Sequence, residues 1–292
     1  MTPPIVTAIV LNWCNEEATA ACLQSLLNSD YSTLKLLLVD NGSPDDSFEG
    51  LRASFPEIEF LQTGQNLGYT GGNNRGIERT LRGKSEYLLI LNNDIVVDPC
   101  AVSKLVDVAE NSDKKIGGIV PKILYYDDPD RIWYAGGEFS PMLGLGLHWG
   151  EGTPDRSDNS EGIRDITFMT GACCLISAEA LRELKGFDDD FFAYVEDAEL
   201  SIRMAKAGYT MCYEPEARVL HQCPLPGTPP SPFQIRQRDR NRRRIMRKHA
   251  SLRQRLPFLM RFFVTRIILL ARYALMRDWE RARAIVHGMG GN

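Results

Sequence analysis

Short apolar runs alternate with amphipathic segments along the first 120 residues of the chain. The apolar runs are rich in β-branched residues and leucine and are bounded by polar residues or proline, which is typical of buried strands. The segments between them carry apolar residues three and four positions apart, which predicts helices. Such alternation predicts an α/β fold with a mostly parallel sheet and helices on both faces. The predicted strands are residues 5–11, 34–39, 57–62 and 87–91, and the predicted helices are residues 16–28, 71–82 and 101–111.

Polar clusters follow these predicted strands, at residues 12–15, 40–46, 66–74 and 92–94. The carboxyl ends of parallel strands meet at one edge of a sheet, and ligands of such sheets bind there. The clusters therefore predict a ligand site at that edge.

The pattern changes in the second half of the chain. Residues 127–165 are rich in glycine, proline and acidic residues. The segment is too long for a simple connector, which indicates a loop that takes part in binding. Five prolines within residues 223–233 predict a hinge. The elements predicted between these two segments are strands at 167–176, 209–213 and 218–220 and helices at 179–184 and 196–207.

Charge is distributed unevenly. Residues 233–292 hold 16 Lys and Arg against 3 Asp and Glu, a net charge of +13, whereas the remainder carries −17. An acidic globular part followed by a basic tail suggests two separate functions.

The seven cysteines are odd in number and form no CxxC motif, so we expect reduced thiols and no structural zinc site. The first residues lack the pattern of a secretory signal, so we expect a cytoplasmic protein.

Two polar clusters are candidates for nucleotide binding. The stretch NLGYTGGNNRGI (residues 66–77) precedes a predicted helix, and amides at a helix N-terminus can hold an anion. It has neither the dinucleotide nor the P-loop spacing, and a structural turn is the alternative. Asp40 opens the sequence DNGS after a strand, where it either forms a turn or accepts the N–H of a pyrimidine base.

Three further positions suggest catalysis. Asp94, in Asn-Asn-Asp after a strand, suits a hard divalent cation, with a simple turn as the alternative. Glu196 and Asp197 follow an aromatic stretch, a setting that suits a general base, although acids are also favoured at a helix start. His221 follows a predicted strand and is either a structural residue or a ligand.

Nine segments then occur in a fixed order across about residues 5–250: IVLNWCNEE, CLQSLL, LLLVDNGSPDDS, NLGYTGGNNRGI, LLILNNDIVVDP, TGACCLISAEAL, GFDDDFFAYVEDAELSIRMAKAGY, PEARVLH and RNRRRIMRKH. In this order they resemble family-2 glycosyltransferases, especially the bacterial rhamnosyltransferase-like branch that acts on surface polysaccharides. The resemblance implies a GT-A catalytic domain over residues 1–222, with a nucleotide-sugar half at about 1–120 and an acceptor half at about 121–222. The hinge at 223–233 and a basic amphipathic helical tail at 234–292 follow.

The resemblance also implies roles for single residues. Asp197 matches the catalytic base of the family's ED motif, and Asp94 matches the last acid of its DxD metal motif, with His221 as the second metal ligand. Asn92 stands where many members have the first Asp of that motif. The acceptor side would be bordered by Gly171, Ala172 and Glu196. The nucleotide sugar would be bordered by Asn12, Asp40, Asn66, Gly68, Gly71, Asn73, Asn74, Asn92 and Asn93.

The implied reaction is a single in-line displacement that inverts the anomeric centre, with Mg²⁺ or Mn²⁺ as cofactor. The donor favoured by the branch is dTDP-L-rhamnose, with a UDP-sugar as the alternative, and the acceptor is a saccharide or a lipid-linked saccharide. A sugar nucleotidyltransferase would need a glycine-rich basic signature near the first strand, which LNWCNEE lacks. A nucleic-acid-binding role for the basic tail is disfavoured because residues 256–276 are too apolar for a solvated arm.

The tail suggests contact with a membrane surface. Residues 256–276 are apolar except for Arg261, Arg266 and Arg272, and each arginine would cost roughly 2.5–3.5 kcal/mol at the centre of a spanning helix. We expect these arginines to share one side of an amphipathic helix with Arg255 and Arg277, and the helix to lie on an anionic membrane. The alternative is packing on the catalytic domain or in a homodimer.

Overall fold

The computed structural model describes residues 2–156 and 162–290. Its centre is one large sheet, in which the strands lie in the order β10-β12-β6-β11-β4-β1-β2-β3, while β5 pairs with β12 and β7 with β6. The strands of the sheet are β1 (Val6–Asn12), β2 (Leu34–Asp40), β3 (Glu59–Gln62), β4 (Tyr87–Asn92), β5 (Ile95–Val97), β6 (Ile116–Tyr125), β7 (Asp128–Tyr134), β10 (Arg164–Ile166), β11 (Cys173–Ser177) and β12 (Thr210–His221).

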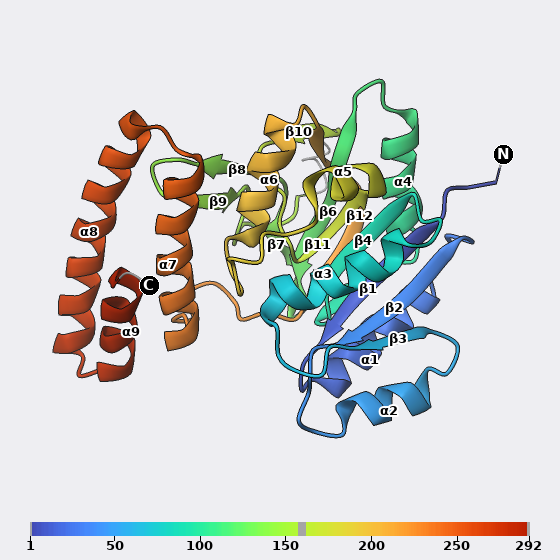
Figure 1. The fold of residues 1–292 in the computed structure, drawn as a ribbon, viewed down its shortest axis with the longest axis horizontal. Helices are drawn as coiled ribbons and strands as arrows, with labels where there is room; N and C mark the ends of the chain where they lie inside the picture. Colours follow the sequence, from blue (N-terminus) through green and yellow to red (C-terminus); the bar gives the residue numbers. More distant parts are fainter. Residues whose placement is uncertain (1, 157–161, 291–292) are drawn as a thin grey trace.

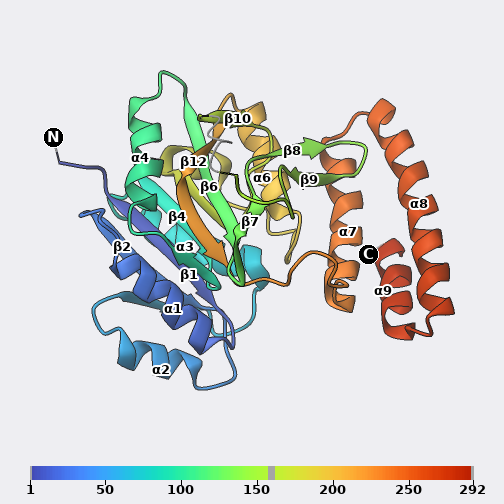
Figure 2. The same ribbon diagram turned by 180° about the vertical axis from the view of Figure 1, so that it is seen from behind.

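Helices cover both faces of this sheet, and β1, β2, β3 and β4 run parallel. Helices α3, α5 and α6 lie over one face, and α1 and α4 lie over the other (Figures 1 and 2). The predicted α/β fold, with a mostly parallel sheet covered on both faces, is confirmed. The helices of this part are α1 (Glu16–Leu27), α2 (Ser47–Ser54), α3 (Gly68–Leu81), α4 (Ala101–Asn111), α5 (Ala178–Leu184) and α6 (Glu196–Lys206).

The second half of the sheet differs from the sequence-based prediction. The strand β11 runs antiparallel between β4 and β6, and it begins only at Cys173. Residues 167–172, predicted as part of that strand, leave the sheet because the Met169 N–H donates to Ser201 Oγ and the Gly171 N–H donates to Asp197 Oδ2. The two short strands expected at 209–213 and 218–220 form the single strand β12, which has a register shift between Glu214 and Arg218.

The long segment 127–165 contains regular structure. It forms β7 and a separate hairpin of β8 (Gly137–Ser140) and β9 (Leu145–His148). Periodicity did not reveal β8 and β9 because each is only four residues long and contains a glycine. The hairpin extends from the sheet toward the C-terminal helices (Figure 1).

Three helices form the C-terminal tail: α7 (Pro232–His249), α8 (Leu252–Leu275) and α9 (Trp279–Met289). Helix α7 begins at Pro232, inside the predicted hinge, because Ser231 and Gln234 form a capping box and proline fits the first helical position. In Figures 1 and 2, α7 stands between the catalytic sheet and the pair α8 and α9.

Side chains of α7 attach the tail to the catalytic part. Asn241 Nδ2 donates to the carbonyls of Ala193 and Tyr194, at 2.9 and 2.8 Å. His249 Nε2 lies 2.9 Å from the buried Glu199 Oε1 of α6. Lys248 forms an ion pair with Asp188. Helix α7 therefore packs on the part of the chain that contains the large sheet.

Helix α8 has an apolar outer face. Ile267 and Ile268 are each 61% exposed, and Leu275 is 86% exposed. The expectation that five arginines share one side is wrong. Arg266 turns inward to Asp239 Oδ1 at 2.6 Å, and the Arg255 Nε donates to carbonyls at the end of α7. The apolar residues exposed along this face are Leu252, Leu256, Leu259, Met260, Phe263, Val264, Ile267, Ile268, Leu275 and Met276.

Candidate active site

The carboxyl ends of β1 and β2 are joined by a polar network. Asn12 is fully buried, and its Nδ2 donates to Asp40 Oδ1 at 3.1 Å. The Ser43 hydroxyl donates to the same oxygen at 2.6 Å, and the Ser43 N–H donates to Asp40 Oδ2 at 3.2 Å. Asp40 thus forms the turn considered in the sequence, while Oδ2 keeps capacity for another donor because a carboxylate oxygen has two lone pairs. Asn12 positions Asp40.

The glycine-rich stretch is the first part of α3 and the loop before it. Asn41 Nδ2 donates to Gly68 O at 3.0 Å, and its Oδ1 accepts the Leu67 N–H at 3.1 Å. Asn66 is exposed, and its Oδ1 accepts the Gly68 N–H at 2.8 Å. Gly68 has φ +73°, and a Cβ there would lie 2.3 Å from Phe192 O. The helix therefore begins at Gly68, three residues before the predicted start, and Gly71 lies in its first turn.

Two asparagines of α3 form hydrogen bonds with backbone atoms of the protein. Asn73 is buried, and its Nδ2 donates to Tyr69 O at 2.9 Å, while its Oδ1 has no partner in the described part of the chain. Asn74 bonds the backbone of Phe187 through both its amide nitrogen and its oxygen, each at 2.9 Å. Asn74 thus fastens the loop that leads to α6.

Asp94 and His221 are brought together by the pairing of β5 with β12. Asp94 Oδ1 lies 3.2 Å from His221 Nε2, yet this oxygen is buried and accepts no hydrogen bond from the described residues. The Trp133 ring packs edge-on against the imidazole, with centroids 4.6 Å apart. Asp94 Oδ1 and the imidazole nitrogen thus converge, and they form an ion pair only when His221 is protonated.

This convergence fits a divalent cation. Two ligands of an octahedral ion with bonds of about 2.1 Å lie roughly 3 Å apart. No group of three or more His, Cys, Asp or Glu side chains in residues 2–156 and 162–290 is arranged to hold a metal ion, so a cation here would take its other ligands from backbone or amide oxygens, water or a bound molecule. Asn92 ends β4 close by, and Asn93 is held by Thr19, to whose hydroxyl its Nδ2 donates at 2.8 Å.

Asp197 faces the segment before β11. Its Oδ2 accepts the Gly171 N–H at 3.1 Å, and its Oδ1 accepts the Ala198 N–H at 2.8 Å. Burial raises the pKa of Asp197, and these amide bonds partly oppose the rise. Ala172 O accepts the Asn92 N–H at 2.9 Å, so this segment connects Asp197 to the end of β4. A carboxylate fixed in this way, with a raised pKa, is suited to accept a proton.

Glu196 is the more buried of the two acids. Burial, and then the charge of Asp197, raise the pKa of Glu196 well above its ordinary range. Its Oε2 has no hydrogen-bond partner among the described residues. Burial therefore favours the protonated form of Glu196 more strongly than that of Asp197, whose carboxylate accepts two backbone N–H groups.

The chain enters α6 through a strained turn. Tyr194 and Val195 both have positive φ, +69° and +75°, and such values are costly for a β-branched residue. The two bonds from Asn241 hold the carbonyls of this turn. The tail therefore supports the backbone geometry that places Glu196 and Asp197.

Several contributors to the site were not singled out in the sequence, although Tyr69 and Asn241 lie within two of the nine ordered segments. The Tyr69 hydroxyl donates to Gly171 O at 2.7 Å and so ties α3 to the segment beside Asp197. Trp133 comes from β7 and Asn241 from α7, far from the residues they support.

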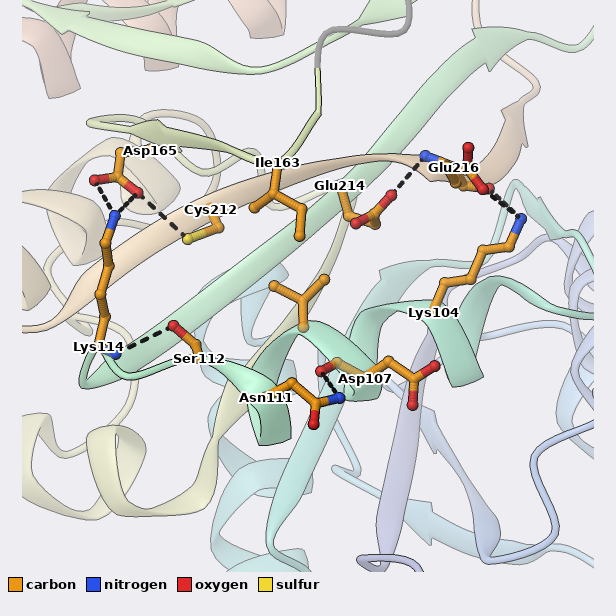
Figure 3. A pocket seen from close by; sticks show the side chains of 11 residues that line it. Lys104, Asp107, Asn111, Ser112, Lys114, Ile163, Asp165, Cys212, Glu214 and Glu216 are labelled. Atoms are coloured by element: carbon orange, nitrogen blue, oxygen red, sulfur yellow. Dashed lines mark hydrogen bonds and ion pairs between the residues drawn. The ribbon is translucent and has the colours of Figure 1, made fainter.

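A cavity of about 510 Å³ lies elsewhere, between α4, β12 and β10 (Figure 3). Its lining is largely charged and internally paired, as in the ion pair of Lys114 with Asp165. None of the residues of the candidate active site lines it.

Residues 3–246 match the family model described as "Glycosyltransferase like family 2". The chain belongs to this glycosyltransferase family. A curated relative from Mycobacterium tuberculosis is named N-acetylglucosaminyl-diphospho-decaprenol L-rhamnosyltransferase. It is 30% identical over 218 residues, which cover 68% of this chain and 70% of the relative. The predicted resemblance to family 2 and to rhamnosyltransferases is confirmed.

This family-2 glycosyltransferase also shares its fold with solved structures. One is GalNAc-T7 with UDP, GalNAc and Mn²⁺, with a TM-score of 0.63 and 16% identity; the match covers 83% of this chain and 48% of that one. Another is the mannosyltransferase PcManGT from Pyrobaculum calidifontis with GDP-Man and Mn²⁺, with a TM-score of 0.58 and 14% identity; it covers 98% of this chain and 86% of that one. These similarities establish the GT-A fold.

Proposed function

We propose that this glycosyltransferase transfers L-rhamnose from dTDP-L-rhamnose to a hydroxyl of a saccharide or lipid-linked saccharide acceptor, with inversion at the anomeric carbon, in cell-surface polysaccharide synthesis. The observation that carries the proposal is the Asp197 carboxylate, fixed by two amides next to the segment Gly171–Ala172. The name of the mycobacterial relative supports both the sugar and the lipid-linked acceptor.

The donor occupies the polar edge of the sheet in this proposal. The free capacity of Asp40 Oδ2 suits the imide N–H of thymine or uracil, and Asn12 holds that carboxylate in place. The exposed Asn66 and the first turn of α3, from Gly68 through Gly71 to Asn73, border the ribose and diphosphate. A UDP-sugar satisfies the same base contact and is the competing donor.

Asp94 and His221 would hold Mg²⁺ or Mn²⁺, with Asn92 and Asn93 beside them. When bound, the cation would neutralise charge on the departing nucleoside diphosphate. The solved structures of this fold that contain Mn²⁺ support this assignment.

Asp197 takes the proton of the acceptor hydroxyl as its oxygen attacks the anomeric carbon. The bond to the nucleoside diphosphate breaks on the opposite side, so one displacement inverts the centre. Burial raises the pKa of Glu196 well above its ordinary range, which favours its protonated form, so in this proposal Glu196 donates a hydrogen bond to the acceptor rather than taking its proton.

The outer face of α8 binds the membrane surface in this proposal. Its exposed apolar side chains are flanked by the exposed arginines Arg261, Arg272 and Arg277, which suit anionic head groups. No helix in the described part of the chain has the length and apolarity needed to cross a bilayer. A surface-bound enzyme can reach a lipid-linked acceptor.

A thermal-shift screen tests this function. A ligand that binds only the folded state raises its melting temperature. We expect stabilisation by dTDP and dTDP-rhamnose with Mn²⁺ or Mg²⁺, its loss with a chelator, and its loss in Asp94→Ala. A larger shift with UDP would assign the donor to the UDP-sugars, and no shift with any nucleotide would refute the proposal.

A further inference from the structure

A second cavity, of about 200 Å³, lies between the tail helices and the β8–β9 hairpin. Four charged residues line it, Arg238, Asp239, Arg242 and Arg266. The rest of the lining is apolar or aromatic and consists of Leu145, Pro230, Ile235, Leu269, Tyr273 and Ile285. Three guanidinium groups thus face one carboxylate inside a largely apolar wall.

The positive charge of this cavity is not balanced by the protein. Arg266 Nη1 lies 2.6 Å from Asp239 Oδ1, and Arg242 Nη1 lies 3.4 Å from the same oxygen. Both Asp239 and Arg242 are buried. Burial, and then the charge of Arg266, lower the pKa of Arg242 to about 10. Excess buried charge of one sign is unfavourable, so the cavity favours an anionic occupant.

Arg238 connects this cavity to the catalytic site. It is exposed and forms no ion pair or hydrogen bond with the described residues. Arg238 lies three residues before Asn241 on α7, and Asn241 donates to the carbonyls of Ala193 and Tyr194, which lead into the helix that carries Asp197. The positive charge of Arg238 also opposes the rise that burial causes in the pKa of Asp197.

We propose that this cavity binds the diphosphate of a lipid-linked acceptor, with Arg238 and Arg266 contacting its anionic oxygens. The proposal rests on the acceptor class given under the proposed function. The volume is below the roughly 300–1,000 Å³ of sites that enclose a whole small molecule, so it suits a head group. The saccharide then extends toward Asp197, and the lipid leaves along α8, which supplies Arg266, Leu269 and Tyr273 to the cavity and carries the exposed apolar face.

Calorimetry with farnesyl diphosphate tests the site without sugar transfer. The titration is made on the full chain in the presence of chelator and without nucleotide. We expect binding of farnesyl diphosphate but not of farnesol, and weaker binding of short-chain phosphatidylglycerol. Arg238→Gln should lower the affinity at least roughly tenfold, as expected for the loss of one hydrogen bond to a charged group. Arg238→Lys should retain part of the affinity for farnesyl diphosphate.

Arg236→Gln is the matched control, because Arg236 is exposed on the same helix and does not line the cavity. It should bind farnesyl diphosphate like the wild type. Arg238→Gln should keep its melting temperature and its affinity for dTDP with Mn²⁺, and Asp94→Ala should keep farnesyl diphosphate binding.

Unchanged farnesyl diphosphate affinity in Arg238→Gln would overturn the proposal. So would loss of dTDP affinity in that variant, which would assign Arg238 to the donor, or loss of farnesyl diphosphate binding in Asp94→Ala. Tighter binding of phosphatidylglycerol would assign the cavity to bulk lipid and also overturn it. Absence of rhamnosyl transfer would refute the proposed function alone, because these titrations measure no transfer.

Discussion

Two adjacent acids at the start of α6 both have a raised pKa, but their surroundings oppose the rise to different degrees. Asp197 receives two backbone N–H groups, which stabilise its charged form, whereas Glu196 Oε2 receives none from the described residues. Burial raises the pKa of Glu196 most, and the negative charge of Asp197 raises it further. The surroundings therefore favour the charged form that a base needs more at Asp197 than at Glu196.

The substitution Asp197→Asn tests the base. Because an amide cannot take the acceptor proton, kcat should fall by about 10²–10⁴-fold. One of the two amide bonds is also lost, which should lower the free energy of unfolding by about 1–3 kcal/mol. Steady-state kinetics with saturating substrates and donor calorimetry are the measurements, and donor affinity should hardly change.

Glu196→Gln is the matched control for that experiment. Because the neutral acid and the amide are alike in shape, we expect kcat to stay within a few-fold of the wild type. An inactive Glu196→Gln beside an active Asp197→Asn would transfer the role of base to Glu196.

The raised pKa of Glu196 predicts a pH dependence of stability. Above its ordinary value of 4.5, the unfolded chain loses the proton that the folded protein retains. Stability should therefore fall as the pH rises from 4.5 toward the raised pKa, by up to ~1.4 kcal/mol per pH unit from this group. Urea denaturation at several pH values should show a shallower decline for Glu196→Gln. Parallel curves for the two proteins between pH 5 and 7 would show that Glu196 ionises normally.

At the scale of elements, the tail helix α7 supports the catalytic turn. Asn241→Ala removes both bonds to the carbonyls of Ala193 and Tyr194, where the backbone is strained. We expect kcat to fall at least roughly tenfold, since small displacements of a catalytic group are costly, while the KM for the donor changes little. Arg247→Ala, at an exposed position of the same helix, is the control and should be active. Wild-type kcat in Asn241→Ala would show that the turn keeps its geometry unaided.

Some elements could be predicted from the sequence, and others could not. The strands β1, β2 and β4 were predictable because they are apolar runs buried on both faces, and the polar residues after them mark the ligand edge. The pairing of Asp94 with His221 depends on β5 and β12, which are far apart in the chain. The support from Asn241 depends on tertiary packing, which periodicity does not report. The family resemblance, rather than spacing, supplied the roles of Asp94, Asp197 and His221.

At the scale of the whole molecule, the catalytic part and the outer face of α8 lie on opposite sides of α7 (Figures 1 and 2). The catalytic part carries the candidate active site, and the outer face of α8 exposes a continuous apolar stripe next to arginines. Soluble monomers rarely expose large contiguous apolar patches, so this stripe requires a partner.

Co-sedimentation with anionic vesicles tests the membrane as that partner. The wild type should bind at low salt, and replacing both Ile267 and Ile268 by Glu should weaken binding at least roughly tenfold, because burial of one such side chain contributes about 1.5–3 kcal/mol. Leu27→Glu, on α1 of the catalytic part, is the control. Failure of the wild type to bind, together with a dimer in solution that the double variant abolishes, would make the stripe a homodimer interface instead.

The central claim is an inverting transfer with Asp197 as base, and the proton NMR spectrum of the product tests it most directly. With dTDP-β-L-rhamnose and a lipid-linked acceptor, the account predicts a new α-linked rhamnose formed by the wild type. A β-linked product would show retention of configuration and contradict the single displacement.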